Sequence, residues 1–257
     1  MIKAEIKASI GMIILARPWS DNALNGDMVK RLQKVLREWK AEPSLKVVLI
    51  TGEGDSFSAG ADSEEMHGLQ KDARTDYVRQ AKDVLYELQT FPKPTVAALN
   101  GPAVAGGCEL CLACDFRFAH EKVSLGLNHI HAGLTTGWGG TVRLLRLLPR
   151  SKALELIFTG KQIDALTAHR WGLVDKLFPY EQFIRHVLAW CKQITLHSAD
   201  ALCAYKQTVL EHDDAVLDEE ERINREVNRF LALWDTAAHQ ASLSPALKRG
   251  KKESGHV

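Results

Sequence analysis

Two segments of small residues each follow an apolar run typical of a strand. Phe57–Asp62 reads FSAGAD and follows Val47–Ile50, and Asn100–Glu109 reads NGPAVAGGCE and follows Thr95–Leu99. Small side chains let a backbone approach a ligand closely, and the first N–H groups of a helix have no partner within it. Two such N–H groups aimed at one point stabilise negative charge on a carbonyl oxygen. The two segments therefore predict an oxyanion hole where strands pass into helices.

The surrounding pattern alternates predicted strands and helices. A β-hairpin is predicted over residues 4–15 around Gly11, and an amphipathic helix over Met28–Trp39. A second helix is expected over residues 73–89, and Phe116–Ala119 is a further short strand. This alternation indicates an α/β fold with a parallel sheet and crossover helices. Beyond Pro179 the chain becomes helical and charged. Its last helix is expected over Ala215–Trp234, with an apolar stripe of Ile223, Val227, Phe230, Leu231 and Trp234.

The two loops are part of an ordered series of signatures that resembles the crotonase (enoyl-CoA hydratase/isomerase) superfamily over most of the chain. The others are Arg17-Pro18, Asn22-Ala23-Leu24, Gly137-Trp138-Gly139-Gly140-Thr141, Thr159-Gly160 and Gly172-Leu173-Val174. Tight turns and close packing are the structural alternative for these glycines. The resemblance implies a ββα spiral core over residues 1–180. It also implies a helical C-terminal region over 181–257 that takes part in subunit packing and in the acyl-CoA site.

The resemblance also assigns residues. The backbone N–H groups of Ala61 and Gly106 would form the oxyanion hole for the enolate of an acyl-CoA thioester. Ala59 and Lys248 are implied to contact CoA. CoA is then part of the substrate, so no separate cofactor and no metal is expected. The implied assembly is a homotrimer, or a homohexamer of two trimers.

Enolate chemistry also needs an acid or base near the thioester. Glu109 lies three residues after Gly106 and matches one of the two glutamates that the family's hydratases use to orient and deprotonate water. Its structural alternative is an acidic residue that complements a helix N-terminus. The place of the second glutamate belongs to His129, whose imidazole exchanges protons near neutral pH. A histidine hydrogen-bonded within a loop is the alternative for His129.

Trp138 stands in the glycine-rich turn where many hydratases carry a small residue. With Gly137 it is expected to line the acyl pocket and to favour short or branched acyl groups. The combination of His129, Gly133 and Trp138 is similar to the ethylmalonyl-CoA decarboxylase branch of the superfamily. Asp62, Glu64 and Glu65 are interpreted as solvated residues of a mobile flap.

Three functions follow. The first is hydration of a short or branched enoyl-CoA, and the second is decarboxylation of ethylmalonyl-CoA or methylmalonyl-CoA. The third is a non-catalytic relative that binds CoA or RNA, although the presence of a glutamate at position 109 favours a catalytic protein. The net charge of +1 gives no reason to expect nucleic acid or a membrane as the main partner. The start of the chain lacks the layout of a signal peptide, and no apolar run is long enough for a membrane span. We therefore expect a cytoplasmic protein.

Cys108, Cys111 and Cys114 share a spacing of three, which resembles part of an iron–sulfur ligand set without its fourth cysteine. On a helix this spacing keeps the sulfur atoms roughly on one face, where cysteine acts as a small apolar residue. Core packing is the favoured interpretation.

Overall fold

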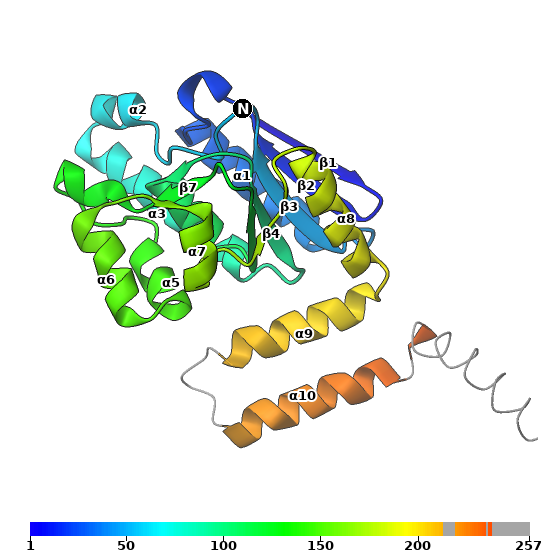
Figure 1. The fold of residues 1–257 in the computed structure, drawn as a ribbon. Helices are drawn as coiled ribbons and strands as arrows, with labels where there is room; N and C mark the ends of the chain where they lie inside the picture. Colours follow the sequence, from blue (N-terminus) through cyan, green and yellow to red (C-terminus); the bar gives the residue numbers. More distant parts are fainter. Residues whose placement is uncertain (213–218, 235, 238–257) are drawn as a thin grey trace, which may run out of the picture. The chain divides into compact units, whose positions relative to one another are not determined.

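The computed structural model describes residues 1–212, 219–234 and 236–237. The chain divides into two compact units, Met1–Thr195 and Leu196–Val257. The first unit has an α/β fold, as predicted (Figure 1). Its strands are β1 (Ile2–Lys7), β2 (Ile10–Leu15), β3 (Val47–Gly52), β4 (Thr95–Leu99), β5 (Ala103–Val104), β6 (Phe116–Ala119), β7 (Ser124–Gly126), β8 (Ile163–Asp164) and β9 (Lys176–Leu177). Its α-helices are α1 (Gly26–Lys40), α2 (Ser63–Gly68), α3 (Lys71–Gln89), α4 (Gly106–Leu112), α5 (Gly140–Leu147), α6 (Arg150–Thr159), α7 (Ala165–Trp171) and α8 (Phe183–Thr195). Short 3-10 helices cover Pro18–Ser20 and Asn128–Ala132.

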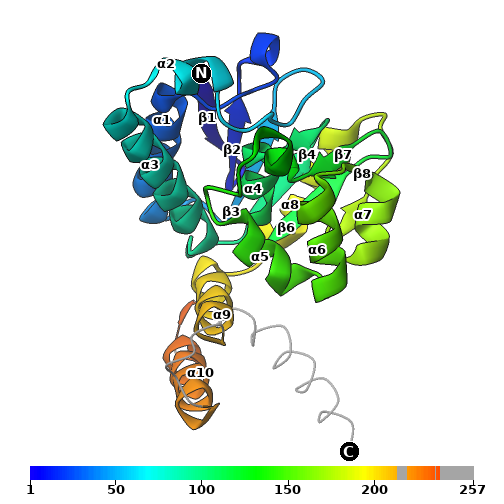
Figure 2. The ribbon, with the colours of Figure 1, turned by 90° about the vertical axis from the view of Figure 1, so that its left-hand side faces the viewer.

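The larger sheet has the strand order β1-β2-β3-β4-β6-β9, parallel except for the β1–β2 hairpin. Successive residues of β3 point to opposite faces, as the pleat of a strand requires. Val48 and Ile50 join the main core, to which α1 and α3 also contribute. Val47 and Leu49 face the second core cluster, which α8 completes. Both faces of β3 are therefore buried, which explains its uninterrupted apolar sequence. Figure 2 shows α1 and α3 side by side.

The predicted hairpin is present, but its turn is not at Gly11. The turn residues are Ala8 and Ser9, both with positive φ (50° and 64°), as in the two-residue turns that suit a twisted hairpin. Gly11 lies within β2 instead. A Cβ at this position would lie 2.5 Å from Cζ3 of Trp39, so the missing side chain makes room for the indole.

The two small-residue segments meet at the carboxyl edge of the sheet. β3 and β4 are parallel neighbours, so the segments that follow them leave from the same edge. Phe57 N–H donates to Pro102 O at 3.1 Å, and Val104 N–H donates to Ser58 O at 3.0 Å. β5 then pairs with β7 and β7 with β8 in a second, three-stranded sheet. This edge is where ligands bind in open parallel sheets.

The boundary between the units lies after Thr195, later than the expected boundary at residue 180. The cause is α8, whose Phe183, Val187 and Cys191 are buried against the large sheet. These side chains recur every four residues and give the helix one apolar face. α8 therefore belongs to the first unit.

The second unit contains α9 (Ala199–His212) and α10 (Glu219–Trp234). The guanidinium of Arg229 on α10 binds Glu211 on α9, and its Nη1 donates to Thr208 Oγ1 at 2.9 Å. Among the helices that the structure describes, none has the length and apolar character needed to cross a membrane.

Cys108 and Cys111 on α4 and Cys114 just beyond its end are buried in the main core and form no disulfide, as the core-packing interpretation expected. Burial raises the pKa of the Cys111 thiol well above its usual value. Within the described residues, no cluster of three or more histidine, cysteine or acidic side chains is arranged to hold a metal ion.

Candidate active site

Residues 21–24, here called the strap, hold the segment that contains Ala61 by backbone hydrogen bonds. Leu24 N–H donates to Gly60 O at 2.7 Å, and Asp62 N–H donates to Leu24 O at 3.0 Å. These two bonds bracket Ala61 in a parallel bridge, so the N–H of Ala61 points to the other side of the segment. No acceptor for it occurs among the described residues. The bridge therefore fixes the backbone of Ala61 and leaves its N–H available.

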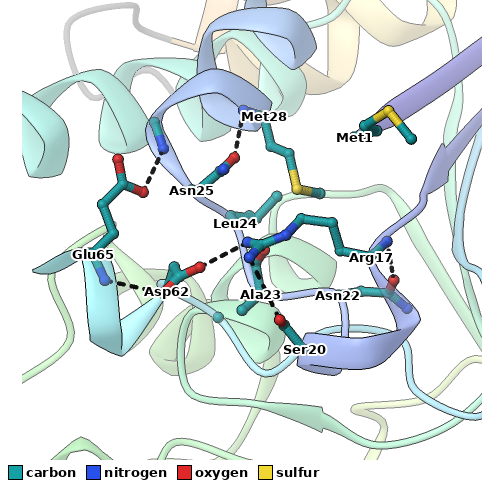
Figure 3. A network of polar contacts seen from close by, with 12 residues as sticks. Met1, Arg17, Ser20, Asn22, Ala23, Leu24, Asn25, Met28, Asp62 and Glu65 are labelled. Atoms are coloured by element: carbon teal, nitrogen blue, oxygen red, sulfur yellow. Dashed lines mark hydrogen bonds and ion pairs between the residues drawn. The ribbon is translucent and has the colours of Figure 1, made fainter.

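A network of polar side-chain contacts holds this strap in place (Figure 3). Arg17 Nη1 donates to Asp62 Oδ2 at 2.7 Å and to Ala23 O at 2.9 Å. Asp62 also caps α2, because its Oδ1 accepts the Glu65 N–H at 3.1 Å. The Glu65 N–H and then the Arg17 guanidinium hold the pKa of the Asp62 carboxyl below its usual value. The interpretation of a solvated flap is thus wrong for Asp62 and Glu65. Glu65 binds the N–H of Gly26 at 2.9 Å, while Glu64 is exposed.

The first residue of α4 is Gly106, whose N–H is likewise without an acceptor among the described residues. Ala105, just before it, has φ 49° and ψ −123°, a strained backbone conformation for a residue with a Cβ. Gly60 packs directly against this helix start, since a Cβ at Gly60 would lie 2.5 Å from the nitrogen of Gly106. The segments that carry the Ala61 and Gly106 N–H groups are therefore in contact.

The carboxylate of Glu109 is almost fully buried (1% exposed) one turn into α4. It accepts three backbone N–H groups from the glycine-rich turn. Gly137 donates to Oε1 at 3.3 Å, while Trp138 and Gly140 donate to Oε2 at 2.9 and 2.7 Å. Because Gly140 is the first residue of α5, the carboxylate complements the N-terminus of that helix and not that of α4. The structural alternative therefore holds in part, and the three N–H groups together surround one carboxylate.

The imidazole of His129 contacts the carboxylate of Glu109 as well. Its Nε2 lies 3.1 Å from Glu109 Oε1, and its side chain is only 16% exposed. The other ring nitrogen, Nδ1, is buried and has no hydrogen-bond partner among the described residues. The ring lines a cavity of about 140 Å³ whose wall is mostly apolar. The structure thus brings together Glu109 and His129, the two side chains singled out in the sequence.

Trp138 is buried and packs on the start of α4. A Cβ at Gly106 would lie 2.4 Å from its Cζ3, and its ring centroid lies 6.2 Å from that of Tyr77. The exposed Gly137 contributes its N–H to the Glu109 cage. The indole therefore lies beside the candidate oxyanion N–H of Gly106. Its role as a wall of the acyl pocket stays a prediction, as does that of Gly137.

The two positions expected to contact CoA differ in what the structure describes. Ala59 N–H is engaged by Asp21 O at 2.9 Å, whereas its carbonyl accepts no hydrogen bond from the described residues. Lys248 lies outside the described residues. Both assignments remain predictions.

Two buried residues at the site were not singled out in the sequence. Tyr77 donates its hydroxyl to Leu24 O at 2.6 Å, and burial raises the pKa of this phenol. Arg143 donates from Nη1 to Trp138 O at 2.6 Å, and burial lowers its pKa while the charge of Glu109 acts in the opposite direction. Tyr77 lies on the apolar stripe of α3, where it is indistinguishable in sequence from a core aromatic. Arg143 is the first charged residue of α5, three residues after Gly140, and this position was the available signal.

Comparison with known proteins agrees with this geometry. A family model described as enoyl-CoA hydratase/isomerase matches residues 5–252. The chain belongs to the enoyl-CoA hydratase/isomerase family. It is 32% identical over 244 residues to the mitochondrial enoyl-CoA hydratase of Pongo abelii, covering 95% of this chain and 82% of the relative. It is 35% identical over 206 residues to the 2,3-dehydroadipyl-CoA hydratase of Escherichia coli, covering 80% of each.

A solved structure of an enoyl-CoA hydratase from Bacillus anthracis superposes with a TM-score of 0.91 at 30% identity, covering 96% of each chain. The expected crotonase fold is therefore confirmed. Membership of the family also gives the general function of this chain, which is that of an enzyme acting on acyl-CoA thioesters.

Proposed function

We propose that this protein hydrates the double bond of a short or branched 2-enoyl-CoA. The observation that carries the proposal is the contact between Glu109 Oε1 and His129 Nε2, 3.1 Å apart, one helical turn behind the open N–H of Gly106. An acid–base pair beside a free backbone donor is what addition of water to a thioester-conjugated alkene requires. The names of the relatives support the same reaction class.

The proposed reaction requires stabilisation of an enolate and transfer of a proton to the α-carbon. Hydroxide from water bonds to the β-carbon, and the electrons of the double bond move onto the thioester oxygen. The N–H groups of Ala61 and Gly106 would stabilise this enolate, since neither has another acceptor among the described residues. A proton then reaches the α-carbon, and the Glu109–His129 pair is placed to deliver it.

The proposed limit on the size of the acyl group is based on the position of Trp138. Its ring reaches the Cα side of Gly106 so closely that not even a methyl group fits between them. Bulk at that point leaves less room beside the thioester. We infer a preference for short or branched acyl groups.

Decarboxylation of ethylmalonyl-CoA or methylmalonyl-CoA is the competing function. It is favoured by His129 in the place of the family's second glutamate, so that the site pairs one carboxylate with an imidazole. Loss of CO2 from such a thioester forms the same enolate, and the same N–H groups would hold it.

Product analysis with crotonyl-CoA and ethylmalonyl-CoA, side by side, tests the proposal. We expect 3-hydroxybutyryl-CoA from the first and no CO2 from the second. Glu109→Gln should abolish hydration and retain CoA thioester binding in calorimetry, because the CoA body and the backbone N–H groups provide the affinity. CO2 release with inert crotonyl-CoA would establish the decarboxylase instead. Binding of both thioesters without turnover would establish a non-catalytic relative.

A further inference from the structure

We propose that the proton-transferring atom of this site is Nδ1 of His129, and that Glu109 is a positioning residue for that imidazole. This inference rests on the proposed hydration. It reverses the division of labour in which a glutamate takes the proton from water.

The first argument is that Glu109 has no room for a proton. A carboxylate offers about four lone-pair positions, two on each oxygen. Here Oε2 accepts the N–H groups of Trp138 and Gly140, and Oε1 accepts the N–H of Gly137 and lies 3.1 Å from His129 Nε2. Three positions are thus taken by backbone N–H groups, and the fourth faces His129 Nε2. A proton on Oε2, or one on Oε1 directed away from His129, would displace a buried hydrogen bond, which carries a desolvation cost.

The second argument is the tautomer of His129. A carboxylate has no proton to donate, so the contact at 3.1 Å requires the hydrogen on Nε2. In the neutral ring Nδ1 is then a lone-pair acceptor. It is buried and without a partner among the described residues. A buried polar atom with an open lone pair is costly unless a substrate or water molecule uses it.

The third argument is the charge around the ring. Glu109 on α4 is the acidic side chain that touches it, and Arg143 on α5 is the charged neighbour of that carboxylate. His131, two residues on, is engaged elsewhere, with its Nε2 3.1 Å from Gly160 O. An imidazolium formed at His129 would therefore face a fixed carboxylate. This is the arrangement by which the aspartate of a serine-protease triad orients and stabilises its histidine.

The step balances with one water molecule. Its oxygen bonds to the β-carbon while one of its protons passes to His129 Nδ1, and the π electrons move onto the thioester oxygen. The imidazolium then gives this proton to the α-carbon as the enolate electrons return, and Nδ1 recovers its lone pair. Glu109 keeps its charge and its four donors throughout.

The closing experiment combines two readouts. Nitrogen-15 NMR of histidine-labelled protein reports which ring nitrogen of His129 carries hydrogen, with His129→Gln for assignment. We expect hydrogen on Nε2 in the unmodified protein. In Glu109→Gln we expect it on Nδ1, because the new amide N–H₂ donates to Nε2. The matched control is His131→Gln, which should leave the His129 signals in place.

Crotonyl-CoA hydration is the second readout. His129→Gly should lose roughly 10²–10⁴-fold in kcat, and added imidazole should restore about tenfold or more, whereas His129→Gln should be equally slow and insensitive to imidazole. Hydrogen on Nδ1 in the unmodified protein would overturn the proposal. So would a His129→Gln variant that hydrates at the unmodified rate while Glu109→Gln is inactive. If the unmodified protein leaves crotonyl-CoA unchanged, the proposed hydration fails, and the NMR result still decides whether Glu109 holds the imidazole with Nδ1 open.

Discussion

At the scale of single residues, Gly106 and Trp138 pack so closely that there is no room for a side chain at position 106 while the indole stays in place. A methyl group on Gly106 would lie 2.4 Å from Cζ3 of the buried indole. Gly106→Ala should therefore lower the free energy of unfolding by about 1–3 kcal/mol, the usual cost of overpacking. Urea unfolding measures the loss. The double variant Gly106→Ala with Trp138→Leu should recover part of it, because the smaller side chain vacates that space. Equal stability of the Gly106→Ala single variant would show that the indole moves freely.

The Arg17–Asp62 pair gives a pH-dependent prediction. The pKa of Asp62 is lowered in the folded protein, so its carboxylate contributes stability above its unfolded pKa. That contribution is lost as the pH falls through the folded value. Asp62→Asn keeps the helix cap and removes the ion pair, so it should cost about 1–2 kcal/mol at pH 7. The difference from the unmodified protein should shrink as the pH falls below about 4, the usual pKa of an aspartate.

Asp164 provides the matched control for Asp62. It caps α7 through the Thr167 N–H at 2.6 Å and also has a lowered pKa, but its neighbours include no comparable ion pair in the described residues. Asp164→Asn should therefore change stability much less at every pH. Denaturant titrations of both variants at several pH values measure this. An equal loss in the two variants would assign the effect to capping alone.

At the scale of elements, the long periodic segments and the four-residue strand β6 were predictable, whereas the strands of two or three residues were not. The patterns of α1, α3 and the buried strands gave the right element within a few residues, because burial of one helix face or of a whole strand leaves a periodic sequence. The short strands β5, β7 and β8 leave no such pattern. They exist because long-range pairing brings Ala103, Leu125 and Ile163 together.

The start of α4 carries a strained residue, and relief of that strain is measurable. Ala105 has φ 49° and ψ −123°, a region that glycine adopts more easily than alanine. Ala105→Gly should raise the free energy of unfolding by about 1 kcal/mol. The control is Ala41→Gly at the exposed end of α1, where φ is −96° and the same change should cost about 0.5 kcal/mol. A loss of stability in both variants would show that Ala105 bears no strain.

At the scale of the whole molecule, the sequence named several residues that the structure brings together, including Glu109 and His129, but not how they contact one another. The meeting of the two small-residue segments was predictable because each follows a buried strand and the strands are parallel, whereas the choice of Ala61 and Gly106 came from the family resemblance. The bonds from Trp138 and Gly140 to Glu109, and those between Leu24 and the residues on either side of Ala61, join segments far apart in the chain. Single-sequence patterns carry no signal for such pairs. Likewise, the spacing of Glu109 and His129 did not reveal that the two side chains touch.

The second unit raises the question of assembly, which family resemblance predicts as a trimer or hexamer. On α10, Arg225 and Arg229 face α9, where both pair with Glu211. Ile223 and Val227 project from the opposite side of α10, about 180° around the helix from Arg225. They are 52% and 48% exposed. We therefore predict that this apolar face takes part in subunit contact, with a second copy of the chain as the partner that the family resemblance implies.

Charges on that face should separate the subunits. The unmodified protein is expected to sediment as a trimer or a multiple of it. The double variant Ile223→Glu with Val227→Glu is expected to sediment as a monomer. Asn228→Glu is the control, since Asn228 is exposed and lies well around the helix from the apolar face. It adds charge without placing it on that face, so it should keep the unmodified assembly. Because burial of a charge at an apolar interface is costly, the double variant should dissociate even at high protein concentration. An unmodified protein that is monomeric, or a double variant that keeps its assembly, would remove this face of α10 from subunit contact.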